Sequence, residues 1–302
     1  MLEYCTEAWH TILIKTMLQY KLHNNGWAVI FEDFDLRTAT PDDIKHASDL
    51  MKTSTLAVFK NQSLTIQDEL NIGYMFGNVT TEYAPGQEEF INETVDLNID
   101  PNGHLTRVTG ALNEHGKPGT AGYVDAMEWH NNQPHLLNSN HGKQRGPLVW
   151  LYGVKGTAGS RTSYTNSVLA YRDLNQATKD QIKDLKGIYY ATADFRGPIA
   201  GGIEIDNNAP SQSVVIQHST GELGMYHSFY QLERYEGMTR EESLAIAQPL
   251  HDHLIQDKYC YHHDWQDGDV VIADQWFGIH KRWPFEKIQE RLLHRMVFGF
   301  RD

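Results

Sequence analysis

Two stretches of the sequence carry side chains that could bind one metal ion together. The first is the segment 130–132, which contains His130 and Asn132. Residues i and i+2 of a strand point to the same side, so both side chains could face one ion if this segment is extended. The second stretch, 265–280, reads as a turn, an apolar strand and a polar exit that ends at His280. Because histidine is the commonest metal ligand, His130 and His280 are the first candidates for a metal site.

A second strand-like stretch follows, and it brings two arginines into the same part of the chain. The apolar run Leu292–Phe300 begins directly after Arg291 and contains Arg295. Side chains four residues apart on a strand share a face. We therefore expect both guanidinium groups to face one cavity.

Other histidine clusters are less specific. His251 and His253 lie two residues apart on a predicted helix, where side chains at that spacing point in different directions. We interpret them as part of a solvated helix face. His262, His263 and Asp264 precede a predicted strand, and at most one of these histidines can share a strand face with the aspartate. A structural or surface role is the interpretation for this second cluster.

The composition excludes several classes of protein. The chain has 302 residues, 40% hydrophobic and 22% charged, as in a globular protein, and it has no apolar run long enough for a membrane span. The formal charge is −13, without a Lys/Arg-dense stretch, which argues against a nucleic-acid-binding protein. Cys5 and Cys260 are the only cysteines and Met1–Tyr20 lacks signal-peptide features, so we expect a cytoplasmic protein without a disulfide framework or cysteine zinc site.

Hydrophobic periodicity and turn residues predict one α+β domain over residues 1–302, with its β core late in the chain. A helical and strand-containing part covers residues 1–80, a turn-rich, lid-like insertion covers about 80–125, and the core covers about 126–302. The expected helices are Ile12–His23, Thr40–Met51, Leu64–Phe76, Asn175–Leu185 and Thr239–Ile255. The expected strands are Trp27–Phe31, Leu56–Phe59, Leu148–Val154, Ser163–Val168, Ser213–Gln217, Asp269–Ala273 and Leu292–Phe300.

Four stretches, in order along the chain, are similar to motifs of the taurine dioxygenase (TauD/TfdA-like) family of Fe(II)/2-oxoglutarate-dependent oxygenases. They are Leu56–Thr65 leading to Phe76-Gly77, Val149–Tyr171, His218–Gly221 with Met225-Tyr226, and Gly268–Arg295. Together they extend over about Gly26 to Phe300. Such collinearity is more specific than any single motif.

The resemblance implies a double-stranded β-helix, or jelly-roll, core and a site for Fe(II), 2-oxoglutarate and O2. His130 and His280 match the iron-binding histidines. Thr162 and Arg291 match the residues that hold the distal carboxylate of 2-oxoglutarate, for which a bidentate guanidinium is well suited. Arg295 matches an arginine that binds an anionic substrate in some members.

The sequence departs from the family at the third ligand, where a carboxylate is expected and Asn132 stands. A carboxylate would give Fe(II) a hard anionic oxygen, whereas a carboxamide offers a neutral one, so weaker iron binding is expected. Four interpretations are open: Asn132 coordinates as a neutral ligand, it leaves the position to water or an anion, Glu128 or Asp125 takes over, or the residue is an engineered change or marks a dead site.

The predicted function is hydroxylation of a small organic substrate, an amino acid or organic acid, with release of succinate and CO2. Halogenation or desaturation on the same scaffold, and 2-oxoglutarate binding without catalysis, are the alternatives. The aromatic residues that flank the motifs either line the substrate pocket or belong to the core; they are Trp129, Tyr123, Trp276 and Phe277. A homo-oligomer is compatible with the sequence.

Overall fold

The computed structural model describes residues 18–23, 25–80, 99–114, 116, 122, 124–132, 148–189, 211–218 and 220–300. Half of the predicted helix Ile12–His23 and more than half of the lid-like insertion lie outside these residues. Within the described part, the helix prediction is wrong, because Lys21–Leu22 forms strand β1 and pairs with strand β2 (Val29–Phe31). The His23 amide donates to the Ala28 carbonyl at 2.9 Å, and this turn folds the chain back into a hairpin.

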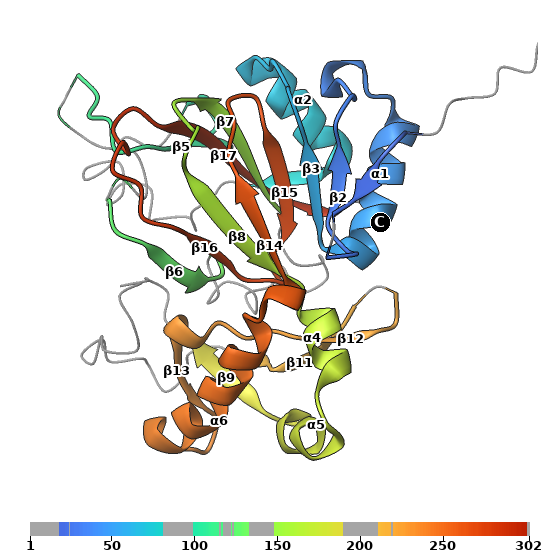
Figure 1. Cartoon of the computed structure of the whole chain (residues 1–302), viewed down its shortest axis with the longest axis vertical. Coiled ribbons are helices and arrows are strands. Elements are labelled where there is room, and N and C mark those ends of the chain that lie inside the picture. Colours follow the sequence, from blue (N-terminus) through green and yellow to red (C-terminus); the bar gives the residue numbers. More distant parts are fainter. Residues whose placement is uncertain are drawn as a thin grey trace, which may run out of the picture.

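Two facing β-sheets form the upper part of the molecule (Figure 1). The larger runs in the order β1, β2, β3 (Leu56–Phe59), β15 (Val270–Asp274), β7 (Leu148–Lys155), β17 (Leu292–Phe300) and β4 (Gly77–Thr80), and β5 (Leu105–Val108) also pairs with β17. The smaller runs in the order β14 (Cys260–Asp264), β8 (Arg161–Thr165), β16 (His280–Arg282) and β6 (Met127–His130). The expected α+β class and jelly-roll core are confirmed.

Strand alternation divides the side chains of the larger sheet between two cores. Val149 and Leu151 of β7 face the smaller sheet, whereas Trp150 between them faces the outer helices. These helices are α1 (Pro41–Ser54) and α2 (Ile66–Phe76), which begin directly after the N-caps Thr40 and Thr65, each with a complete capping box. The two helices therefore cover the outer face of the larger sheet.

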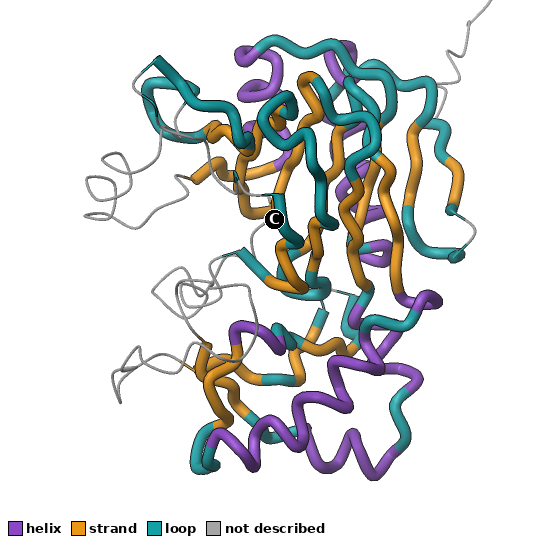
Figure 2. Tube along the Cα trace, turned by 60° about the vertical axis from the view of Figure 1, so that its left-hand side comes forward, coloured by secondary structure: helices purple, strands orange, loops and turns teal. Residues whose placement is uncertain are grey.

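A second, smaller unit packs below the sandwich, as Figures 1 and 2 show. It contains helices α4 (Ser167–Asp173), α5 (Gln176–Ile182) and α6 (Arg240–Leu254), the 3-10 helix η2 (Phe229–Gln231), and strands β9 (Lys186–Tyr189), β10 (Ser211–Ser213), β11 (Val215–Gln217), β12 (Leu223–Met225) and β13 (Leu232–Tyr235). Two short 3-10 helices lie elsewhere, η1 (Leu36–Thr38) and η3 (Asp257–Tyr259). No helix in the described ranges is long and apolar enough to cross a bilayer.

The predicted strand Ser163–Val168 is too long at its end. Strand β8 stops at Thr165, and the Asn166 side chain accepts hydrogen bonds from the amides of Val168 and Leu169, both at 3.1 Å. Asparagine at this position satisfies the free amides of a helix start, so α4 begins at Ser167. The predicted strand Ser213–Gln217 is likewise divided into β10 and β11.

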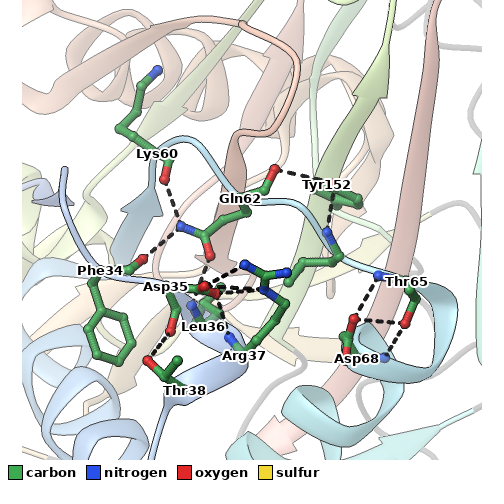
Figure 3. A network of polar contacts seen from close by, with 11 residues as sticks. Phe34, Asp35, Leu36, Arg37, Thr38, Lys60, Gln62, Thr65, Asp68 and Tyr152 are labelled. Atoms are coloured by element: carbon green, nitrogen blue, oxygen red, sulfur yellow. Dashed lines mark hydrogen bonds and ion pairs between the residues drawn. The ribbon is translucent and has the colours of Figure 1, made fainter.

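Gln62, a buried glutamine, ties the segment 34–36 to the chain that follows strand β3 (Figure 3). The Gln62 amide nitrogen donates to the carbonyls of Phe34 at 2.7 Å and Lys60 at 2.6 Å, and its oxygen accepts from the Leu36 amide at 2.9 Å. Three backbone groups that β-pairing leaves free are thus satisfied by one side chain. This explains in physical terms why a glutamine follows strand β3.

The interpretation of His251 as part of a solvated helix face is wrong. His251 is only 2% exposed and its ring stacks on Phe229 with centroids 5.1 Å apart. Helix α6 packs His251 into the apolar core of the lower unit together with Leu250 and Leu254, so helical spacing alone did not reveal its buried face. Burial lowers the pKa of His251 to about 4, and Lys281 acts in the same direction.

Replacing His251 by phenylalanine should reduce the sensitivity of the fold to acid. Because the folded-state pKa lies below the ordinary value of about 6.5, the stabilisation is complete above pH 6.5 and is lost as the pH falls toward 4. His251→Phe keeps the stacking but removes the proton, so the loss of unfolding free energy over this window should shrink by about 3 kcal/mol. Urea unfolding from pH 7 to pH 4 measures it, and an unchanged pH dependence would contradict the prediction.

Candidate active site

Two histidines face each other across neighbouring strands of the smaller sheet. His130 ends β6, His280 begins β16, and the two residues are direct register partners. Their ring centroids lie 4.1 Å apart, and their exposed fractions are 1% and 7%. Residues 150 positions apart are therefore brought within reach of one ion by a single strand pairing.

Both imidazoles are set up as neutral ligands. The Nδ1 atom of His130 lies 2.6 Å from the Glu128 carbonyl oxygen. A carbonyl can only accept, so Nδ1 carries the hydrogen and Nε2 is the ring nitrogen with the lone pair. Burial lowers the pKa of His130 to about 4 and, together with the neighbouring His130, lowers that of His280 well below 6.5. Neutral imidazole is the form that binds metal.

A small cavity of about 40 Å³ joins this pair to the other polar residues predicted for the site. It is lined by His130, Asn132, Thr162, His280, Arg291 and Arg295, along with Arg282, Met127, Val108, Leu151 and Leu293. The expectation that the strand runs on to Asn132 is not met, because β6 ends at His130 and Asn132 lies in a bend. Its side chain nevertheless lines the same cavity as His130.

No carboxylate stands with the two histidines among the described residues, since no group of three His, Cys, Asp or Glu side chains there could hold a metal. Glu128 is engaged elsewhere, with its Oε2 2.9 Å from Lys281 Nζ. The Asp125 backbone carbonyl accepts from Arg282 Nη2 at 2.7 Å. Of the protein ligands weighed for the third position, Asn132 is the one that lines the cavity.

Arg291 is a buried cation in the wall of this cavity. It is 2% exposed, and its Nε and Nη1 atoms have no hydrogen-bond partner among the described residues. Burial, with Arg282 nearby, lowers its pKa to about 9. An isolated buried charge is costly, so this geometry calls for an anion. The residues thus fit the distal carboxylate of 2-oxoglutarate.

Thr162 lies on β8 opposite Arg282 of β16 and lines the cavity from the smaller sheet. Its hydroxyl oxygen accepts a hydrogen bond from the Trp265 indole nitrogen at 2.9 Å. Because a hydroxyl can accept and donate at once, its own hydrogen remains able to reach an anion. Trp265 itself is fully buried and holds the hydroxyl in place.

Sequence reasoning missed Arg282, a third arginine in the cavity wall that is 4% exposed. The sequence did contain a signal for it, because Arg282 follows His280 by two residues and side chains at that spacing share a strand face. Arg295 is half-buried, and desolvation lowers its pKa to about 10. The cavity therefore carries three guanidinium groups and two neutral imidazoles.

One residue proposed for substrate contact, Trp129, does not join this group. Trp129 is packed in the apolar core of the lower unit and does not line the cavity, because its side chain leaves β6 on the side away from His130. Tyr123 lies outside the described residues. The cluster 262–264 has the structural role expected of it, since buried His263 lies 3.1 Å from Asp269, on the far side of the sheet from the surface pair Arg161–Asp264.

The family profile described as "Taurine catabolism dioxygenase TauD, TfdA family" matches residues 19–297. The chain belongs to this family. It is therefore an α-ketoglutarate-dependent dioxygenase, and the TauD/TfdA cofactors are Fe(II), 2-oxoglutarate and O2.

Curated relatives include an (S)-phenoxypropionate/alpha-ketoglutarate-dioxygenase of Sphingobium herbicidovorans, 24% identical over 81% of this chain and 82% of that protein. Pentalenolactone F synthase of Streptomyces avermitilis is 21% identical over 65% of this chain and 68% of that protein. Among solved structures, AAD-2 in complex with Mn(II) and N-oxalylglycine superimposes with a TM-score of 0.76 at 18% identity, covering 95% of this chain and 99% of that chain. A taurine dioxygenase from Burkholderia xenovorans gives 0.70 at 20% identity, covering 94% and 90%. At this level of sequence identity, the two solved structures support the TauD/TfdA fold alone.

Proposed function

We propose that this TauD/TfdA dioxygenase hydroxylates a small organic acid or amino acid, with release of succinate and CO2. Fe(II) is held by His130, His280 and the side-chain oxygen of Asn132, and 2-oxoglutarate by Thr162 and Arg291. One observation carries the proposal: a buried arginine with two unpartnered nitrogens lines the same cavity as two neutral imidazoles. The cavity needs an anion on one side and offers metal ligands on the other.

The bound Fe(II), with 2-oxoglutarate and O2, supplies oxidation of a C–H bond coupled to decarboxylation. The protein positions the co-substrate and the metal ligands. Thr162 on β8 and Arg291 directly before β17 would hold the distal carboxylate from two sides of the cavity, which orients the co-substrate. Burial keeps the His130 and His280 imidazoles unprotonated, and the apolar side chains Val108, Leu151 and Leu293 reduce access of water to the same space.

The substrate class follows from the charge of the cavity wall. Arg291 is assigned to the co-substrate, which leaves Arg282 and Arg295 in the lining. With positive charge and no acidic side chain among the described lining residues, the site favours an anionic substrate. The phenoxypropionate named for one relative is itself a carboxylate, in line with this choice.

Anaerobic titration with Fe(II) and 2-oxoglutarate tests the proposal through the weak visible metal-to-ligand charge-transfer band. We expect a band in the unmodified protein and none in His130→Ala or His280→Ala. Succinate release on adding O2 and candidate acids then separates hydroxylation from other outcomes, and a chloride-dependent product would reveal halogenation. A band without succinate release from any acid would support 2-oxoglutarate binding alone, and no band would refute the assigned site.

A further inference from the structure

The side chain of Asn132 is not held in place by its own hydrogen bonds. Its Nδ2 atom is buried and has no partner among the described residues. The residue also lies beyond the end of β6, so strand pairing does not fix its backbone. Something else must determine where its amide oxygen lies in the cavity.

The backbone before Asn132 is clamped by a glutamine from the lower unit. Gln231 accepts from the Asn131 amide through Oε1 at 2.8 Å and donates to the Asn131 carbonyl through Nε2 at 3.0 Å. Both bonds are satisfied only in this orientation of the side-chain amide. Ser228 Oγ donates to the same Oε1 at 2.5 Å, and Gln231 is 2% exposed, so the clamp itself is fixed.

A second glutamine holds the backbone of Asn132 itself. The Asn132 amide donates to Gln275 Oε1 at 3.1 Å, and Gln275 is 2% exposed. Gln275 sits in the turn that leads from β15 to His280, where Asp274 Oδ1 accepts from the amides of Trp276 at 2.7 Å and Phe277 at 3.2 Å. The turn that delivers His280 thus also positions Asn132.

We propose that Gln231 and Gln275 are positioning residues that hold the Asn132 amide oxygen at the metal; this rests on the ligand assignment proposed above. A carboxylate is drawn to a divalent cation by its charge, whereas a carboxamide has only its dipole. A neutral ligand therefore depends more on being held beforehand in the binding geometry. Two glutamines, from positions 100 and 143 residues away in sequence, supply that restraint through the backbone.

The test is a double-mutant cycle read by metal affinity rather than by turnover. Gln231→Met and Gln275→Met keep the length of the side chain and remove its hydrogen bonds. Each is made in the unmodified chain and in Asn132→Asp, with Gln248→Met on the exposed side of α6 as the matched control. Co(II) titration, followed by its visible absorption under the same conditions, gives the dissociation constants, and thermal unfolding shows whether each variant is folded.

In the unmodified background, each methionine variant should weaken Co(II) binding roughly ten- to 100-fold. In the Asn132→Asp background, the loss should be at most about threefold, because Coulomb attraction replaces the restraint. An equal loss in both backgrounds would overturn the inference in favour of a merely structural role, and so would no loss in either. If a methionine variant fails to fold, Gln275→Glu serves instead: it keeps the acceptor, and lost affinity there would equally overturn the inference.

The two proposals fail in different ways. If the unmodified protein binds no metal, or if Asn132→Ala binds as tightly as the unmodified protein, the ligand assignment is wrong and the positioning role falls with it. If Asn132→Ala weakens binding while the glutamine variants do not, only the positioning role is wrong.

Discussion

Replacing Arg291 by glutamine should raise the KM for 2-oxoglutarate by about 100-fold or more. Removing one partner of a buried charge pair costs roughly 2–5 kcal/mol, or about 30-fold to several thousand-fold in affinity. Arg291 is 2% exposed and its unpartnered nitrogens face the site, so water cannot replace the lost contact well. Affinity for Fe(II) alone should change by less than about threefold, since Arg291 is not among the assigned ligands. Steady-state kinetics and metal titration measure the two quantities.

The same variant should be more stable than the unmodified protein when 2-oxoglutarate is absent. A pKa lowered to about 9 means that the folded chain disfavours the charged guanidinium, and the penalty is present at every pH below about 9. Without 2-oxoglutarate, Arg291→Gln should therefore unfold at a higher temperature than the unmodified protein; with saturating 2-oxoglutarate the order should reverse. Arg172→Gln, which removes an exposed ion pair with Glu222, is the control and should change neither quantity. A destabilised ligand-free variant with unchanged KM would show that Arg291 serves the fold.

Replacing Asn132 by aspartate should tighten Fe(II) binding on the order of 100-fold, or about 3 kcal/mol. An ionised carboxylate adds charge attraction to a divalent cation and completes a ligand set that Fe(II) prefers. The three arginines that line the cavity stabilise the anionic form of the new side chain, so it should be ionised at neutral pH. Fe(II) titration under anaerobic conditions measures the affinity.

Asn132→Ala provides the other end of this series. If the amide oxygen binds iron, affinity should rise in the order Ala, Asn, Asp. Equal affinity of the Asn and Asp proteins would mean that residue 132 is not a ligand, and equal affinity of Ala and Asn would mean that water or an anion fills the third position. Each result selects one of the interpretations that the sequence leaves open.

Local patterns predicted much of this site because most of its residues lie on strands or directly beside a strand end. The two histidines were identified from one short segment and one strand exit, and the structure pairs them directly. Arg291 and Arg295 were placed on one face by strand period, and both line the cavity. Capping patterns predicted the starts of α1, α2 and α6 to within two residues.

What the sequence did not reveal depends on contacts between distant segments. No local pattern links Gln231 or Gln275 to the loop after His130, because each reaches it from another part of the fold. His251 was misplaced for the same reason, since the lower unit covers a helix face that its own periodicity did not mark as apolar. Lys21 and Leu22 form a strand because a partner strand is available, which overrides their helical spacing.

Strand β17 forms a wall between two chemically different compartments. Leu293 and Arg295 face the cavity, whereas His294 between them binds buried Glu69 of α2, with Nδ1 2.6 Å from the carboxylate oxygen. An insertion or deletion of one residue would exchange these sides, placing a guanidinium among apolar helix contacts and an imidazole in the co-substrate pocket. Evolution and laboratory libraries can therefore vary this strand by substitution, but a change in its length would have to be compensated within the strand itself.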